Sequence, residues 1–172
     1  RPGHGSAEAG TFLVRIDWKG LPFTIRRCQL SQAKNCGLAE RDYAMWEERF
    51  AQDGYLFGTE PVPFLLKHDA FFEAGQSVLS IAEGEGRNGV HLAKKGLDVT
   101  GVEFAPSAVA KAEKLARENG VAPRFVQSNF YEWDWPTDTF DISLGLFFQF
   151  GAGLNLYVRN EILSHSLRQP IK

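Results

Sequence analysis

The sequence predicts an α/β fold built on a mostly parallel sheet with flanking helices, and three observations carry this prediction. An apolar strand over 78–82 runs directly into a glycine-rich turn, and a helical pattern follows over 91–95. A second apolar segment, 97–102, ends in Glu103, an acid about 20 residues after the turn begins. Strand and helix patterns then continue to alternate along the chain. Such alternation is typical of a parallel sheet, because each crossover helix returns the chain to the same edge.

The glycine-rich turn is the stretch most directly linked to function. Gly84 and Gly86 lack a Cβ atom, so the backbone can turn sharply there and a ligand can approach it closely. The helix after the turn begins with free N–H groups and a positive dipole end, which suit a polar or anionic group. In nucleotide-binding units an acid at the end of the second strand accepts hydrogen bonds from both ribose hydroxyls, and Glu103 stands at that position. The alternative is that the glycines only form a tight turn.

Composition is that of an ordinary globular domain. The chain has 172 residues, of which 44% are hydrophobic and 23% are charged, and its formal net charge is −2. This balance predicts no nucleic-acid partner, and no apolar run is long enough to predict a membrane partner. Cys28 and Cys36 match no zinc or redox spacing, and no histidine cluster joins them. We therefore expect reduced thiols, a cytoplasmic location and no metal site.

Three elements are expected before the glycine-rich turn. Alternating apolar residues over 12–25 predict a β-hairpin inside an N-terminal extension, 1–38. From 39 to 52, aromatic residues fall at helical spacing, and we interpret this stripe as a packing face. A second helix, opened by proline, is expected within 61–75.

The elements after the second strand continue the alternation. A helix over 106–119 begins with proline and ends before an Asn-Gly pair. Residues 123–127 are interpreted as a third strand, and the apolar segment 140–148 is typical of a strand buried on both faces. These segments predict one domain over 39–150, followed by a short tail, 151–172.

Residues 40–150 resemble the class I S-adenosylmethionine-dependent methyltransferases. The segments that carry the resemblance are YLFGTEP at 55–61, VLSIAEGEGRNG at 78–89, VTGVEF at 99–104 and FDISLGLFFQF at 140–150. Within that class the chain is most similar to the small tellurite-resistance and thiopurine-type enzymes, which carry a similar glycine-rich turn. The resemblance implies a Rossmann-like sheet, S-adenosylmethionine as the cofactor and a small-molecule methyl acceptor.

The resemblance also implies a set of cofactor-binding residues on or next to the carboxyl ends of the predicted strands. They are Ala82, Gly84, Gly86, Asn88, Glu103, Phe104, Asn129, Phe130 and Leu146. The residues of the turn would hold the methionine moiety, mainly through their backbone, and Glu103 would bind the ribose. Phe104 would lie against the adenine ring, whose edge Asn129 and Phe130 would read. Leu146 would flank the sulfonium end.

Three departures from the pattern of that class matter. Ser80 stands where many members have an acid, which would weaken an indirect contact to the cofactor's amino group. Asn129 stands where an Asp is common, although its amide oxygen can still accept a hydrogen bond from the adenine amino group. Members also continue with three further strands after Phe148, whereas only 151–172 follows here. The sheet is therefore expected to be incomplete at its C-terminal end.

Three functions remain open at this point. The first is methyl transfer to a sulfur, nitrogen, oxygen or chalcogen atom of a small molecule, in which the protein mainly supplies proximity and alignment. No Ser–His or Cys–His arrangement is visible, so the sequence names no catalytic residue. The second is a non-catalytic remnant that binds the cofactor without turnover, which the short C-terminal end favours. The third is an NAD(P)-dependent oxidoreductase, because 84–89 satisfies G-x-G-x-x-G, although Glu83 would crowd a pyrophosphate at this turn.

The outer edge of the last predicted strand has a further physical consequence. Without a neighbouring strand, 140–148 would present unpaired N–H and C=O groups beside exposed apolar side chains. We therefore expect self-association through this edge, unless 151–172 folds back over it.

Overall fold

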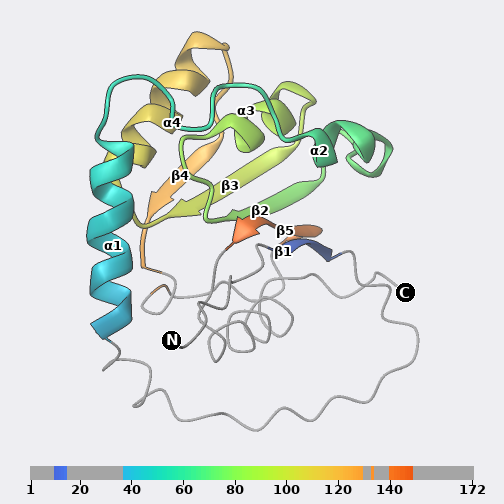
Figure 1. The fold of residues 1–172 in the computed structure, drawn as a ribbon. Coiled ribbons are helices and arrows are strands. Elements are labelled where there is room, and N and C mark those ends of the chain that lie inside the picture. The colour runs from blue at the N-terminus through green and yellow to red at the C-terminus, as the bar shows by residue number, and fades with distance from the viewer. Residues whose placement is uncertain (1–9, 15–36, 130–132, 134–139, 149–172) are drawn as a thin grey trace, which may run out of the picture.

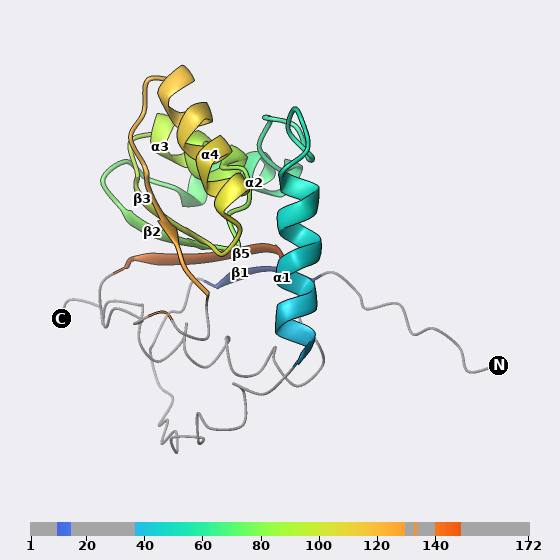
Figure 2. The same ribbon diagram turned by 90° about the vertical axis from the view of Figure 1, so that its left-hand side faces the viewer.

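The computed structural model describes residues 10–14, 37–129, 133 and 140–148. These residues form a five-stranded sheet with the strand order β1-β5-β2-β3-β4, with helices beside it (Figures 1 and 2). The strands are β1 Gly10–Val14, β2 Ser77–Ile81, β3 Asp98–Glu103, β4 Arg124–Gln127 and β5 Ile142–Phe148. The helices are α1 Gly37–Phe50, α2 Pro63–Lys67, the short 3-10 helix η2 Asp69–Phe71, α3 Arg87–Lys94 and α4 Pro106–Glu118.

Strands β2, β3, β4 and β5 run parallel, which confirms the mostly parallel, Rossmann-like α/β fold. β2 lies between β3 and β5, and all of its residues are buried, as the apolar character of this segment predicts. β3 pairs in turn with β4, so that Glu103 lies opposite Gln127. Because parallel strands end at one edge of a sheet, the glycine-rich turn and Glu103 meet there, together with the chain that leaves β4.

β1 occupies the outer edge of β5 and runs antiparallel to it. Leu13 lies opposite Leu144, and Val14 lies opposite Ser143. The prediction of an unpaired outer edge on 140–148 is therefore wrong, because a strand from the N-terminal part of the chain supplies the missing backbone partners. Self-association of the chain stays a prediction, which an unpaired edge on β5 no longer supports. β1 lies in the first arm of the expected hairpin, whereas the second arm, 21–25, lies outside the described residues.

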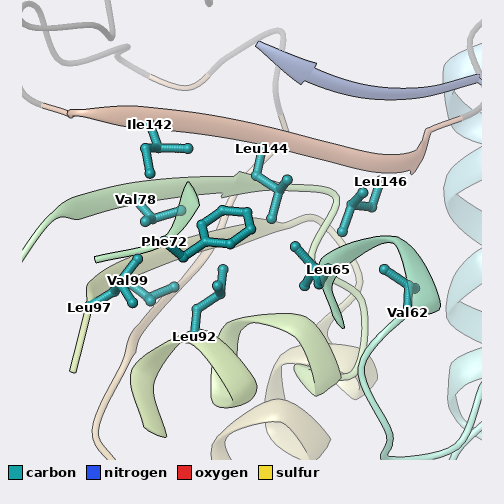
Figure 3. Close-up of a cluster of buried hydrophobic side chains, with 10 residues drawn as sticks. All are labelled: Val62, Leu65, Phe72, Val78, Leu92, Leu97, Val99, Ile142, Leu144 and Leu146. Carbon is teal, nitrogen blue, oxygen red and sulfur yellow. The ribbon is translucent and has the colours of Figure 1, made fainter. Parts of the chain in front are cut away.

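The main core cluster lies between the sheet and helices α2 and α3 (Figure 3). Leu65 from α2, Leu92 from α3 and Phe72 from the chain after η2 pack with Val78 of β2 and with strand residues around it. The next residue of β2, Leu79, belongs to a second cluster, because successive side chains of a strand point to opposite faces of the sheet. Strand β2 is thus buried on both faces of the sheet and lies at the centre of the fold.

The helices differ from the predictions mainly at their ends. α1 begins and ends slightly earlier than 39–52. The helix expected within 61–75 is divided, because α2 ends at Lys67 and His68 takes a non-helical φ of −109° before η2 begins. α3 begins at Arg87, directly after the glycine-rich turn, and not at 91. The first N–H groups of α3 therefore belong to the turn itself.

Candidate functional site

The glycine-rich turn joins β2 to α3 through three residues with positive φ. The φ values are 52° at Ala82, 64° at Gly84 and 89° at Gly86. For Ala82 this left-handed conformation costs about 1 kcal/mol, because its Cβ crowds the following carbonyl oxygen. Ala82 and Gly84 are partly exposed, whereas Glu83 and Glu85 are buried. Gly84, which has no side chain, therefore exposes backbone, whereas both acids of the turn are buried.

The two glycines of the predicted site are required for different reasons. A Cβ at Gly84 would meet no atom closer than the Phe50 ring, at 3.7 Å. A Cβ at Gly86 would lie 2.7 Å from Cα of Ala112, in the backbone of α4. Gly86 is thus needed for the close packing of the turn on α4. Gly84, which has no such restriction, is the glycine whose surroundings suit the expected close approach of a ligand.

The carboxylate of Glu103 joins the end of β3 to the glycine-rich turn. Its Oε2 accepts a hydrogen bond from the Gly84 N–H at 3.0 Å, and its Oε1 accepts from the N–H groups of Phe104 and Ala105 at 2.9 and 3.0 Å. Burial raises the pKa of this carboxyl, and the three N–H donors work against that shift. An ionised carboxylate offers about four acceptor positions, so one position on Oε2 remains for a ligand. Glu103 therefore stabilises the turn through a hydrogen bond and is also a candidate acceptor for a ribose hydroxyl.

The carboxylate of Glu83 points into the protein, beneath the turn. Its Oε2 accepts a hydrogen bond from the Ser80 hydroxyl, and its Oε1 accepts from the Gly89 N–H at 2.6 Å. Burial raises the pKa of Glu83 to about 7, partly offset by these two hydrogen bonds. The expectation that Glu83 would crowd a pyrophosphate at the turn is therefore wrong, because the side chain leaves the exposed side free.

The carboxylate of Glu85 connects the turn to two distant segments. Its Oε2 accepts a hydrogen bond from the Leu56 N–H at 2.7 Å, and its Oε1 forms an ion pair with Nζ of Lys111 at 2.9 Å. The same ammonium donates to the carbonyl oxygen of Gln52 at 2.6 Å. The loop after α1 is thus held against the turn and α4 by contacts that no local sequence pattern indicates.

Asn88 is buried in the first turn of α3. Its Oδ1 accepts a hydrogen bond from the Val62 N–H at 3.1 Å, just before α2 begins. The side-chain oxygen of Asn88 therefore has a partner within the protein, and the expected cofactor contact of Asn88 stays a prediction.

Helix α1, whose aromatic stripe we interpreted as a packing face, lies against the site. Phe50 is buried beside Gly84, and the ring of Tyr43 lies 5.5 Å from the ring of Phe104. The carboxylate of Glu47 accepts hydrogen bonds from the N–H and the hydroxyl of Ser107, at the start of α4. The exposed fraction of Tyr43 is 42%, so its ring borders the site without being enclosed. The aromatic spacing predicts the helix, but nothing in it indicates which side chains remain accessible.

The remaining predicted residues lie on neighbouring strands. Asn129 follows β4 and is exposed, and the N–H of the preceding Ser128 donates to the carbonyl oxygen of Glu103 at 2.9 Å. Leu146 is buried near the end of β5, in the main core cluster. Phe130 lies outside the described residues. The structure therefore brings Ala82, Gly84, Glu103 and Phe104 together at one edge, with Asn129 and Leu146 on the strands to either side.

The described part of the chain offers neither a metal-binding cluster nor a membrane-spanning helix. It contains no group of three or more His, Cys, Asp or Glu side chains placed to hold a metal ion. None of its helices is long and apolar enough to cross a membrane. Cys28 and Cys36 lie outside the described residues.

Residues 78–163, half of the chain, match the family described as Methyltransferase domain. The chain is also similar to two proteins named 23S rRNA (uracil(747)-C(5))-methyltransferase. The one from Pyrococcus abyssi is 33% identical over 112 residues, which cover 65% of this chain and 26% of that protein. The one from Pyrococcus horikoshii is 38% identical over 66 residues, which cover 38% of this chain and 16% of that protein. The chain therefore spans well under a third of either relative.

A solved structure shares the fold. Phosphoethanolamine N-methyltransferase 1 of Haemonchus contortus, in complex with phosphoethanolamine and S-adenosylhomocysteine, superimposes with a TM-score of 0.60. It is 13% identical, and the match covers 76% of this chain and 30% of that one. The family match confirms the expected methyltransferase family, and this structure confirms the expected fold. The narrower similarity to tellurite-resistance and thiopurine-type enzymes is not confirmed.

The residues at the carboxyl edge of the sheet are compatible with S-adenosylmethionine, the cofactor that the resemblance implies. Its amino acid part needs exposed backbone groups, which Ala82 and Gly84 present, and its ribose needs acceptors, of which Glu103 retains one. Its adenine needs an apolar surface, which the partly exposed Phe104 ring and the neighbouring Tyr43 ring can supply.

Proposed function

This chain belongs to the methyltransferase domain family, and we propose that it binds S-adenosylmethionine at the carboxyl ends of β2, β3 and β4 and transfers its methyl group to a small-molecule acceptor. The observation that carries the proposal is the hydrogen bond between the Gly84 N–H and Glu103. It places the acid of β3 directly beside the exposed backbone of the glycine-rich turn. An adenosine cofactor can therefore contact both at once.

The proposed contacts follow from this arrangement. The exposed backbone of Ala82 and Gly84 holds the methionine moiety, and Gly86 and Asn88 support it by shaping the turn. Glu103 accepts a hydrogen bond from the ribose through its remaining acceptor position.

The adenine and the sulfonium end are assigned to the flanking strands. Phe104 lies against the adenine ring, and Asn129 and Phe130 read its edge at the end of β4. Leu146, near the end of β5, is assigned to the sulfonium end, where its side chain packs in the main core cluster.

The chemistry requires little from side chains of the protein. When bound, the cofactor supplies a methyl group on a positively charged sulfur, which an acceptor atom can attack in line. The chain contributes by holding the amino acid, ribose and adenine parts in one orientation, which is catalysis by proximity and alignment. The rigid turn between β2 and α3 serves this purpose, because hydrogen bonds and packing fix its positive-φ backbone.

The nature of the acceptor is the finer part of the proposal. A small-molecule acceptor is supported by the net charge of −2, because nucleic-acid binding generally needs clusters of Lys and Arg. An RNA acceptor is the second candidate, since both similar proteins from Pyrococcus are named as 23S rRNA methyltransferases.

Calorimetric titration of the chain with S-adenosylhomocysteine and, separately, with NADH tests the proposal. We expect S-adenosylhomocysteine to bind and NADH to show no heat of binding. Binding of NADH alone by a folded sample would favour the oxidoreductase alternative.

Methyl transfer from labelled S-adenosylmethionine is then measured with two sets of acceptors. One set contains small thiols, thiopurines, tellurite and selenite, and the other is a 23S rRNA transcript. Transfer to the first set supports the proposal, and transfer only to the transcript assigns the RNA acceptor. Binding without transfer to either set would favour the non-catalytic alternative.

A further inference from the structure

Glu83 is a buried carboxylate to which the proposed function assigns no role. Its exposed fraction is 5%, and its hydrogen-bond donors, the Ser80 hydroxyl and the Gly89 N–H, are both neutral. No Lys or Arg of the described ranges forms an ion pair with it. Glu85, in the same turn, is equally buried but is paired with Lys111. Because an ionised carboxylate buried without a cation is costly, Glu83 lacks the counter-charge that Glu85 has.

The space for the Glu83 side chain is kept open beneath the exposed part of the turn. A Cβ at Gly89 would lie 2.9 Å from Oε1 of Glu83, and a Cβ at Gly101 would lie 3.0 Å from its Cγ. The absence of a Cβ at Gly89 and at Gly101 therefore leaves room for the Glu83 side chain, and at Gly101 also for the Phe125 ring. Glu83 itself stands between Ala82 and Gly84, the two partly exposed residues of the turn.

We propose that Glu83 is the buried counter-charge of the ammonium group on the cofactor's methionine moiety, and that it positions this group through the turn without touching it. This inference rests on the proposed function, in which the methionine moiety lies on Ala82 and Gly84. An ammonium group above the turn supplies the positive charge that no ion pair of the described residues gives to Glu83. Because the Glu83 carboxylate is bonded to the Ser80 hydroxyl, it replaces the acid that we expected to be missing at Ser80.

The charges around Glu83 make this role dependent on pH. Burial raises its pKa to about 7, Glu103 of β3 raises it slightly, and Arg87 of α3 lowers it. β4 contributes the uncharged ring of Phe125 beside Gly101. A bound ammonium favours the ionised carboxylate and so lowers the pKa of Glu83, which means that binding at a pH below 7 releases a proton. Cofactor affinity therefore rises as the pH increases toward about 7 and then levels off.

The test is the affinity for S-adenosylhomocysteine, which carries the ammonium group but no sulfonium, at about pH 6 and about pH 7.5. For the unmodified chain we expect affinity to rise close to tenfold over this interval, beyond the change seen in Glu83→Gln. The reason is that binding below the pKa of Glu83 releases one proton, which makes the affinity rise about tenfold per unit of pH. Comparing two proteins with one ligand cancels the titration of the ligand's own amino group. Glu83→Gln retains the shape and hydrogen-bonding capacity of the side chain, so a folded variant is expected, and circular dichroism checks it.

Two further variants separate Glu83 from the other acids nearby. Ser80→Ala removes a hydrogen bond that lowers the pKa of Glu83, so the midpoint of the affinity curve should move to higher pH. Glu85→Gln removes the neighbouring, already paired acid and should keep the full pH dependence. If Glu83→Gln keeps the dependence, or Ser80→Ala leaves the midpoint unmoved, the counter-charge is not Glu83. If only S-adenosylmethionine shows the dependence, the charge concerned is the sulfonium and the ammonium assignment fails.

These outcomes are distinct from a failure of the proposed function. If S-adenosylhomocysteine does not bind the unmodified chain at either pH, the cofactor site itself is wrong. If it binds, but its affinity changes with pH by the same factor in the unmodified chain and in Glu83→Gln, only the role of Glu83 is overturned.

Discussion

The glycine-rich turn has two buried acids that are held in different ways, Glu83 on what we call its inner side and Glu85 on its outer side. On the inner side, Glu83 is bonded to Ser80 and Gly89, partners three and six residues away in the chain. On the outer side, Glu85 is bonded to Leu56 and Lys111, partners 29 and 26 residues away. The hydrogen bonds of the inner side thus lie within one β–α unit. The outer side depends on the assembly of the loop after α1 and of α4 against that unit.

The two sides therefore contribute to the stability of the domain in different ways. Neutral hydrogen bonds on the inner side set the shape of the turn and leave Glu83 sensitive to pH. The ion pair on the outer side neutralises Glu85 and connects the turn to the rest of the domain. Variants that disturb one side or the other should therefore differ in size and in pH dependence.

The largest effect is expected where the turn packs on α4. Gly86→Ala places a Cβ 2.7 Å from the Ala112 backbone at a φ of 89°, and overpacking plus left-handed strain should cost roughly 4 kcal/mol. Gly84→Ala, which has room for a Cβ, should cost only about 1–2 kcal/mol of strain. Urea denaturation of both variants measures the difference. Equal losses would show that the packing of Gly86 on α4 has been misjudged.

The next effect concerns the outer ion pair. Lys111→Met leaves the buried carboxylate of Glu85 without its cation, which should cost about 3 kcal/mol. The matched control is Lys114→Met, which removes an exposed pair with Glu118 on the same helix and should cost less than about 0.5 kcal/mol. Thermal or urea denaturation compares the two. A loss of similar size in both variants would contradict the buried ion pair.

The inner side should show a pH-dependent difference between the unmodified chain and Glu83→Gln. Because the pKa of Glu83 is raised from 4.5 to about 7 on folding, the folded chain holds a proton that the unfolded chain releases between these values. Stability relative to Glu83→Gln is therefore full below about pH 4.5 and falls by roughly 2–3 kcal/mol as the pH rises through 7. Urea denaturation of the ligand-free proteins at about pH 5 and pH 8 checks this. A constant difference would exclude the raised pKa.

The smallest effect is expected at the start of the turn. Ala82→Gly relieves the left-handed strain at a φ of 52° but adds freedom to the unfolded chain, so stability should change by less than about 1 kcal/mol. Ala82→Val should instead lose about 2 kcal/mol, because a β-branched side chain fits that conformation poorly. If the valine variant is as stable as the glycine variant, the backbone at Ala82 does not have this conformation.

The parts of the fold that depend on local pattern were predictable. The strands around Val78 and Val102, the acid Glu103 and the helix beginning at Pro106 all follow from periodicity and from glycine and proline positions. The observed ends of these elements differ from the predicted ends by a few residues. The largest difference in a helix is within 61–75, where the predicted single helix divides at His68.

The parts that depend on distant contacts were not predictable. The pairing of Leu13 with Leu144 joins opposite ends of the described chain, and no property of either segment specifies it. The direction of Glu83 depends on the positive φ values on both sides of it and on space beside Gly101. Asn88 could be placed on the turn, but its hydrogen bond to Val62 could not be foreseen.

The central claim is that Glu103 and the backbone of the glycine-rich turn form one cofactor site. Its most direct test is the affinity of Glu103→Gln for S-adenosylhomocysteine, with Glu113→Gln, an exposed acid on α4, as the matched control. Loss of a charge-assisted hydrogen bond worth about 1.5–3 kcal/mol should weaken binding by roughly ten- to a hundredfold in Glu103→Gln and leave the control unchanged. An unchanged affinity in a folded Glu103→Gln sample would contradict the claim.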